Sequence, residues 1–180
     1  MRRIVIPILL FLLLVLEGVA LDLLPASLVR HEWQLVPHWV LIFLTLKIML
    51  FDKEDTNISV IHGLIFGLLI DVVYTGILGV YMFSYGIVVY LLYGLSRLLH
   101  ANVYTTILLS VIGVAVADMV INILFSASGI TDLIWGQYLL YRMLPTVLAN
   151  VFFLLVLYPL LAKWLEKWKA ERFSKSSAYF

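Results

Sequence analysis

Six polar side chains lie within long apolar runs of this chain, and they carry its clearest potential for chemistry. An ionised side chain that faces lipid is costly, so each of them must point into protein or into a polar cavity. Inside a membrane such groups form structural ion pairs or a pathway for protons or solutes. The six residues are Glu17, Asp71, Asp118, Asn122, Arg142 and Asn150.

Arg142 is the only basic residue of this set. The depth of each residue follows from its offset from the midpoint of its predicted helix, at about 1.5 Å per residue. On this basis Arg142 lies in the outer half of the bilayer. Glu17, Asp71 and Asp118 lie in the same half. An unpaired guanidinium at that depth is costly, so we expect Arg142 to pair with Asp71 or Asp118. One arginine among three acids favours a role in fixing the helix bundle, and a proton or solute path is the alternative.

Catalytic motifs are absent from the sequence. There is no P-loop, no His-Glu-x-x-His and no Ser-x-x-Lys, and the chain contains no cysteine. The histidines are scattered over different segments, which argues against a shared metal site. The sequence therefore predicts no catalytic residue, no metal and no cofactor, and its net charge of +1 gives no reason to expect nucleic acid. The histidines are His31, His38, His62 and His100.

Composition indicates which elements must position these residues. The chain has 180 residues, of which 64% are hydrophobic and 13% charged, and its mean hydropathy is +1.08. A soluble domain of this size is normally only about half apolar. The sequence thus predicts an all-α bundle of six membrane-spanning helices in residues 1–162 and a basic cytoplasmic tail in residues 163–180. The expected spans are Ile4–Leu24, His38–Phe51, Ile58–Val73, Val80–Leu98, Val103–Phe125 and Gln137–Ala162.

Two of these expected spans are unusual. Ile4–Leu24 begins like a signal peptide, but no small-x-small cleavage pattern precedes a soluble domain, so we expect a retained helix. His38–Phe51 reaches only about 21 Å as a helix, against a hydrocarbon core of about 30 Å. This second run must recruit Trp33–Pro37, thin the bilayer locally, or let Lys47 extend to the lipid headgroups.

Small residues and an acid share one face of the third expected span. Gly63, Gly67 and Asp71 recur at every fourth residue, so on a helix they form one stripe against which another helix can pack closely. Gly76 and Gly79 follow directly, and they predict a turn because glycine readily adopts positive φ.

Basic residues predict the orientation in the membrane. In a six-span arrangement most basic residues fall on one side and only Arg30 falls clearly in a linker on the other, and cytoplasmic connections carry the excess of Lys and Arg. Both termini are therefore expected in the cytoplasm. The residues on that side are Arg2, Arg3, Lys53, Arg97, Lys163, Lys167, Lys169, Arg172 and Lys175.

The stripe of Gly63, Gly67 and Asp71, followed by Gly76 and Gly79, resembles the MreD family of rod shape-determining membrane proteins. The resemblance covers essentially the whole chain, including the Leu-Asp-x-x-Pro end of the first span and the Lys/Arg-rich tail. It implies a non-catalytic, multi-pass protein of the bacterial cytoplasmic membrane that belongs to the cell-elongation machinery. The implied partners are the bitopic protein MreC, the actin-like MreB, peptidoglycan synthases and membrane lipid. The five matching residues imply a structural, helix-packing role.

The competing class is the substrate-binding membrane subunit of an energy-coupling factor vitamin transporter. Those subunits are also six-span proteins of similar length. They typically dock their energising module through an Ala-x-x-x-Ala pattern in the first span, whereas Ala20 is the only alanine of Ile4–Leu24. This departure lowers the support for a transporter.

Overall fold

The computed structural model describes residues 2–23, 33–51, 58–131 and 134–176, and within these ranges the regular secondary structure is helical with no β-strand. Two π-helical turns, η1 and η2, adjoin longer helices. The predicted all-α, polytopic membrane fold is confirmed. The elements in chain order are α1 (Arg2–Leu23), α3 (Trp39–Leu50), α4 (Ile58–Ile70), η1 (Asp71–Thr75), α5 (Val80–Ser96), α6 (Val103–Ala127), α7 (Trp135–Tyr138), η2 (Leu139–Met143) and α8 (Leu144–Ser176).

Each expected span corresponds to one helical run of the described chain. Three of these runs are long and apolar enough to cross a membrane, and they are Ile58–Thr75, Val103–Ala127 and Trp135–Leu161. The other apolar helices are shorter, and they are Ile4–Ala20, Trp39–Leu50 and Val80–Ser96. The helix α8 continues past residue 162, so the expected division between bundle and tail falls within one helix and stays a prediction.

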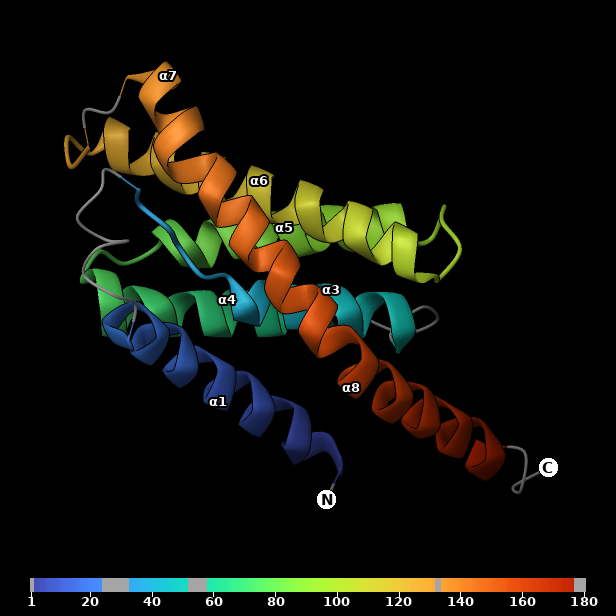
Figure 1. The fold of residues 1–180 in the computed structure, drawn as a ribbon. Helices are drawn as coiled ribbons and strands as arrows, with labels where there is room; N and C mark the ends of the chain where they lie inside the picture. The colour runs from blue at the N-terminus through green and yellow to red at the C-terminus, as the bar shows by residue number, and fades with distance from the viewer. Residues whose placement is uncertain (1, 24–32, 52–57, 132–133, 177–180) are drawn as a thin grey trace.

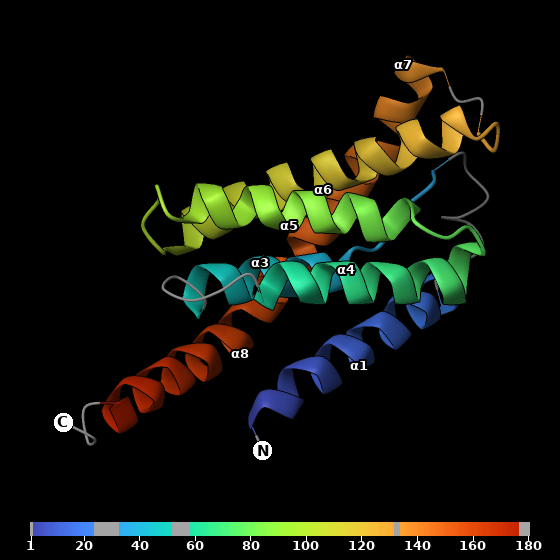
Figure 2. The ribbon, with the colours of Figure 1, turned by 180° about the vertical axis from the view of Figure 1, so that it is seen from behind.

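The helices α3, α4, α5 and α6 run side by side, while α8 crosses them obliquely (Figure 1). Seen from behind, α1 and α8 both slope away from the other helices (Figure 2). The start of α1, the end of α8 and the α5–α6 connection all lie toward one end of the bundle (Figure 1). The α4–α5 turn and the α6–α7 connection lie toward the other end. Both described chain ends thus lie on the same side of the bundle.

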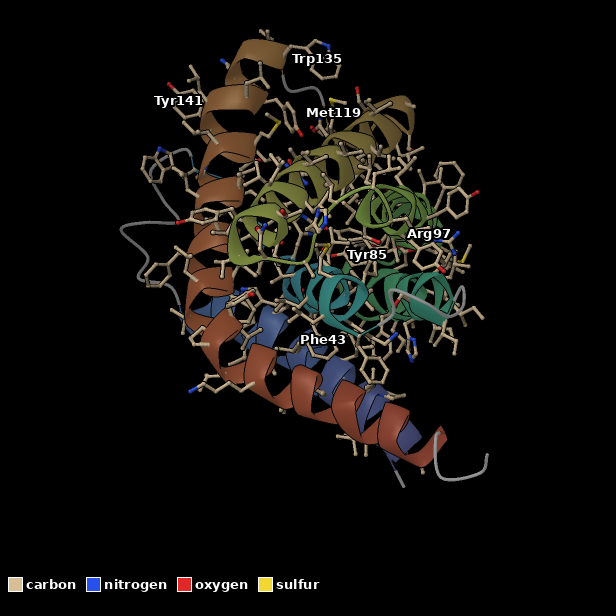
Figure 3. The ribbon with its side chains drawn as sticks, turned by 90° about the vertical axis from the view of Figure 1, so that its right-hand side faces the viewer. Phe43, Tyr85, Arg97, Met119, Trp135 and Tyr141 are labelled. Atoms are coloured by element: carbon tan, nitrogen blue, oxygen red, sulfur yellow. The ribbon has the colours of Figure 1, made fainter. Side chains whose placement is uncertain are left out.

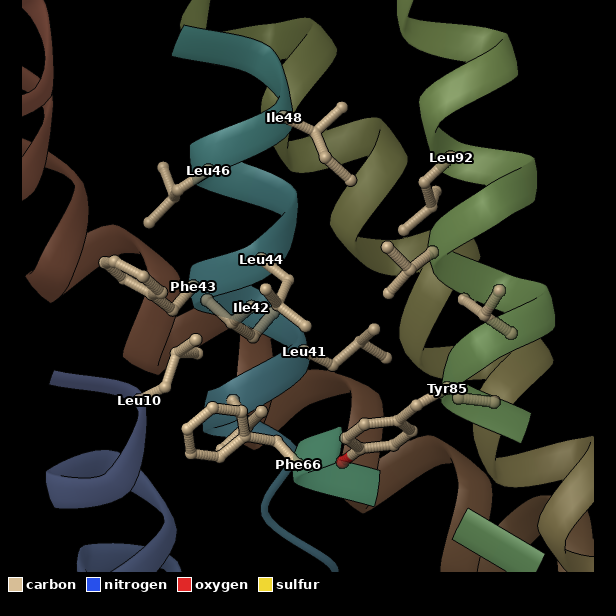
Figure 4. Close-up of a cluster of buried hydrophobic side chains, with 14 of the residues drawn as sticks. Leu10, Leu41, Ile42, Phe43, Leu44, Leu46, Ile48, Phe66, Tyr85 and Leu92 are labelled. Atoms are coloured by element: carbon tan, nitrogen blue, oxygen red, sulfur yellow. The ribbon is translucent and has the colours of Figure 1, made fainter. Parts of the chain in front are cut away.

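The short helix α3 forms the centre of the fold. Every residue from Val40 to Leu50 is buried, and α3 contacts α1, α4, α5, α6 and α8. Its apolar side chains point in all directions and meet Leu10 of α1, Phe66 of α4 and Leu92 of α5 (Figure 4). A helix that is apolar on all sides is stable only when other elements surround it, which is the environment found here.

The structure shows how so short a helix is accommodated. With 12 residues, α3 is about 18 Å long. The preceding residues Trp33–His38 are not helical, and non-helical chain can cover more length per residue than a helix does. Trp33–Pro37 thus precedes α3 as non-helical chain, and its recruitment to the span stays a prediction. Lys47 does not extend to the headgroups, because its side chain is only 1% exposed and its Nζ donates to Ser59 Oγ of α4 at 2.7 Å.

Candidate functional site

Side chains of α8 bond the backbone of the non-helical segment Trp33–His38. Val36 N–H donates to Thr146 Oγ1 at 3.1 Å, and Asn150 Nδ2 donates to Val36 O at 2.9 Å. His38 N–H donates to Asn150 Oδ1 at 2.7 Å. Non-helical backbone at membrane depth is tolerated where protein satisfies its polar groups. Thr146 and Asn150 provide that here, in place of the hydrogen bonds that a helix would form internally.

The π-helical turn η2 adds a backbone bond to the same segment. Gln34 N–H donates to the carbonyl of Tyr141, which lies within η2, at 2.8 Å. Single π turns inside α-helices occur frequently at functional sites. This one makes a carbonyl of the helix available to a neighbouring chain segment.

A buried ionic cluster surrounds Asp118 of α6. Arg142 Nε donates to Asp118 Oδ1 at 3.1 Å, and the Tyr138 hydroxyl donates to Asp118 Oδ2 at 2.8 Å. His38 Nε2 lies 3.9 Å from Asp118 Oδ1, and His38 Nδ1 is 2.8 Å from the hydroxyl of Tyr85. Tyr85 points into the interior of the bundle (Figure 3). Asp118 is fully buried while Arg142 is 12% exposed, so the guanidinium stabilises a carboxylate that water does not reach.

Glu17 of α1 caps the helix that follows the non-helical segment. Its Oε1 accepts the backbone N–H of Val40 at 2.8 Å, in the first turn of α3. Glu17 is itself buried. The first N–H groups of a helix have no partner within the helix, and the N-terminal end carries a partial positive charge that favours an anion. Glu17 supplies an acceptor for one of these N–H groups.

Asp71 performs the same task for α5. It accepts the backbone N–H groups of Gly79 at 2.9 Å, Tyr81 at 2.8 Å and Met82 at 3.1 Å. The turn between them has φ values of +67° at Gly76 and +102° at Gly79, which confirms the turn predicted from these glycines. A fully buried carboxylate thus bonds the amide groups at the start of the next helix.

The glycines of α4 lie against α5. A Cβ added to Gly67 would lie 2.6 Å from the carbonyl oxygen of Tyr81, and one added to Gly63 would lie 3.1 Å from Cγ2 of Val89. By contrast, a Cβ at Gly94 would meet no atom within 4 Å. Close approach of the two backbones at Gly67 therefore requires glycine. The seam joins the two helices of one hairpin, whose turn Asp71 closes.

Comparison with known proteins identifies the family. Residues 2–168 match the family described as rod shape-determining protein MreD. The chain belongs to the MreD family. It is also 29% identical over 163 residues to the "Rod shape-determining protein MreD" of Bacillus subtilis (strain 168), a match that covers 87% of this chain and 90% of that protein. The comparison with solved structures gives no match.

In this member of the MreD family, the six polar residues do not form one network. Arg142 lies against Asp118, not Asp71, so the structure decides between the two expected partners. Glu17 and Asp71 each bond a helix N-terminus, and Asn150 bonds the non-helical segment. The remaining residue, Asn122 of α6, is buried, and its Oδ1 has no hydrogen-bond partner in the described chain. Asp118 and Arg142 are the two of the six that bond each other directly.

Three residues of the site were missed from the sequence. Tyr138 and Thr146 complete a stripe with Arg142 and Asn150 in which a polar residue recurs at every fourth position. In an α-helix such a stripe drifts by about 40° at each step. The π turn advances less per residue and so offsets this drift between Tyr138 and Arg142. The third residue is His38, whose only sequence signal is its position after a proline and before an apolar run.

The site's carboxylates bond groups of this chain. Glu17 and Asp71 accept backbone N–H groups, and Asp118 accepts from Arg142 and Tyr138. In the ranges that the structure describes, no group of three or more His, Cys, Asp or Glu side chains is placed to hold a metal ion. These hydrogen bonds hold helix ends and one non-helical segment in place, which is a structural role.

Proposed function

We propose that this protein is a non-catalytic component of the bacterial cell-elongation machinery in the cytoplasmic membrane. It serves as a scaffold for an MreC-like bitopic protein and, through it, for peptidoglycan synthases that act with the MreB cytoskeleton. The observation that carries the proposal is the family match over residues 2–168, which extends from the start of α1 into α8. The relative from Bacillus subtilis is named for the determination of rod shape.

The interior chemistry supports a scaffold over a transporter. In many transporters, the N-terminus of a broken helix points at an anionic group of the substrate. Here α3 is a short interior helix of that kind, but Glu17 bonds its N-terminus and Asp71 bonds that of α5. The positions that an anionic solute would take are thus filled by side chains of this chain. This arrangement favours a rigid core whose outer surfaces contact other proteins.

The proposed orientation has both termini in the cytoplasm. Support comes from the bias of Lys and Arg toward one side, and from the described chain ends, which lie toward the same end of the bundle (Figure 1). Reporter fusions after residue 30, after residue 53 and at the C-terminus test this. The first should report the external side and the other two the cytoplasm, and an external C-terminus would overturn the six-span arrangement.

Depletion of the protein tests the proposed function. Loss should give rounded cells, and the MreC-like partner should lose its position along the lateral wall. Re-expression of wild-type protein should restore both properties, and Arg142→Ala should restore neither if the core must be intact. The opposing result is purified protein that binds a vitamin-sized solute with submicromolar affinity while cell shape is unaffected by its loss. That result would replace the scaffold with a transporter subunit.

A further inference from the structure

The ring of His38 is incompletely bonded although it is buried. Its side chain has no exposed surface, and its Nε2 has no hydrogen-bond partner in the described chain. A carboxylate oxygen, Asp118 Oδ1, lies 3.9 Å from that nitrogen, which is too far for a hydrogen bond. A buried nitrogen of this kind has lost its hydrogen bonds to water without a replacement. The bonds that hold Trp33–His38 against α8 leave this nitrogen unexplained.

The two ring nitrogens of His38 face groups of different kinds. Nδ1 lies 2.8 Å from the hydroxyl of Tyr85, which can either donate or accept. Nε2 faces Asp118, and a carboxylate can only accept. A proton on Nε2 is therefore attracted to Asp118, whereas a bare nitrogen there would set two acceptors against each other. We expect the neutral ring to carry its proton on Nε2, with the Tyr85 hydroxyl donating to Nδ1.

The same neighbours also suit the charged ring, in which both nitrogens donate. Nδ1 then donates to Tyr85, whose hydroxyl turns from donor to acceptor. Nε2 reaches Asp118 Oδ1 at hydrogen-bond length if the two groups approach by about 1 Å. That oxygen already accepts from Arg142 Nε at 3.1 Å, and it has a second lone pair for His38. The charged ring can therefore bond Asp118 without breaking the existing ion pair.

Acidic groups outnumber basic ones around His38. Burial opposes a charge on the ring, and so does a nearby arginine, whereas a carboxylate 3.9 Å away favours one. This carboxylate places a counter-charge directly beside Nε2. The acidic and basic groups of the surrounding elements are Asp118 of α6, Glu17 of α1, Asp71 of η1 and Arg142 of η2.

The other titratable groups around this cluster are tyrosines and one further histidine. The elements α5 and α7 contribute Tyr81, Tyr85 and Tyr138. The titratable residue of α4 is His62, which bonds the carbonyl of Ile58 in its own helix. At this level α8 presents Asn150, which does not titrate. Of these residue types, histidine alone ordinarily changes charge between about pH 5 and 8.

We propose that His38 is a proton-binding site whose occupancy controls how firmly the start of α3 is held. When the ring takes up a second proton from the medium, Nε2 donates to Asp118 and fastens α3 to α6. When that proton leaves, the ring keeps its contact with Tyr85, and Asp118 is left to Arg142 and Tyr138. Arg142 is 12% exposed and connects the cluster to the surface. The core is then a pH-sensitive structure, whichever protein it supports.

Unfolding in mild detergent at about pH 5 and about pH 8 tests the site. The folded protein binds the proton more tightly than the unfolded chain does, so its stability is greatest at the lower pH and falls as the pH rises. His38→Gln removes the titrating ring and leaves every other ionisable group in place. Relative to this variant, the unfolding constant of wild type should rise about tenfold between the two pH values, the effect of one charge-assisted hydrogen bond. His100→Gln, at an exposed position, is the matched control and should keep the wild-type response. An identical pH response in wild type and His38→Gln would overturn the inference.

A direct measurement on the ring keeps the test decisive if His38→Gln fails to fold. Replacing His31, His62 and His100 with Gln leaves His38 as the only histidine of the chain. Nitrogen-15 NMR of the labelled ring then reports which of its nitrogens carry a proton. We expect a proton on Nε2 alone at about pH 8 and on both nitrogens at about pH 5. A ring whose protonation is the same at both pH values, or whose neutral form carries its proton on Nδ1, contradicts the proposal.

Discussion

The α4–α5 hairpin and the contact between Trp33–His38 and α8 satisfy buried backbone groups over very different distances along the chain. In the hairpin, Asp71 bonds amide groups only 8 to 11 residues away. In the other region, Thr146 and Asn150 bond backbone groups 110 to 114 residues away. The hairpin can therefore complete its bonds as a local unit. The non-helical segment depends on the last helix of the bundle.

The two regions also differ in how they pack. The hairpin brings two backbones together at Gly67, where an added Cβ would lie 2.6 Å from a carbonyl oxygen. The segment is held by polar side chains and by the ionic cluster at Asp118. Close packing tolerates little added volume, whereas a polar contact depends on each partner being present. Substitutions should consequently damage the two regions by different mechanisms.

The largest expected effect is on the ionic cluster. Arg142→Ala should destabilise the protein by about 3–5 kcal/mol, because it leaves a buried carboxylate without its counter-charge. The measurement is the amount of monodisperse protein in mild detergent and the midpoint of its denaturant unfolding. Adding Asp118→Asn to Arg142→Ala should recover part of the loss. If Arg142→Ala alone were as stable as wild type, the contact between Trp33–His38 and α8 would not depend on the pair of Arg142 and Asp118.

A smaller effect is expected at the hairpin seam. Gly67→Leu should cost about 1–3 kcal/mol or more, since the side chain must displace the backbone of α5. Gly63→Leu should cost less, because a Cβ there would lie 3.1 Å from Cγ2 of Val89 and 3.2 Å from the carbonyl oxygen of Tyr85, both farther than the 2.6 Å contact at Gly67. Gly94→Leu is the matched control, as a Cβ there meets nothing within 4 Å. If all three variants unfold at the same denaturant concentration, the close approach of α4 and α5 is not a packing constraint.

The smallest expected effect comes from the loss of one hydrogen bond between Trp33–His38 and α8. Thr146→Val keeps the side-chain shape but leaves Val36 N–H without its acceptor. The free energy of unfolding should fall by an amount near the lower end of about 1–3 kcal/mol. Ser128→Ala is the control, since its hydroxyl makes an exposed bond to the carbonyl of Leu124. Unfolding of both variants in detergent is compared with wild type. Identical midpoints would mean that water or lipid replaces the Thr146 bond.

The sequence predicts the hairpin well because its determinants are close together. Gly76 and Gly79 mark the turn, and the spacing of Gly63, Gly67 and Asp71 marks the helix face that packs. Even so, the stripe does not reveal that Asp71 bonds the start of α5. Membrane depth alone left Asp71 and Asp118 equal as partners of Arg142. The two acids differ because Asp71 already accepts amide groups at the start of α5, and depth in the membrane carries no information about that bond.

The long-range region could not be predicted from local patterns. Residues 33–38 carry no signal for extended chain inside a bundle, and the acceptors that hold them lie more than 100 residues later. Thr146 is apolar enough to pass as an ordinary helix residue, and Tyr138 as an interfacial aromatic. Their place in one stripe with Arg142 and Asn150 becomes informative only once the segment opposite them is known.

The dependence of Trp33–His38 on Thr146 and Asn150 also sets an order of events during synthesis. Ribosomes add about 5–20 residues per second, so the intervening 110 or so residues take about 5 to 20 s. Throughout that interval, the backbone of the segment has none of its final acceptors. These bonds to α8 can therefore form only after residues 146–150 have been synthesised. Any nascent chain that stops short of Asn150 lacks the acceptor of His38 N–H and the donor to the carbonyl of Val36.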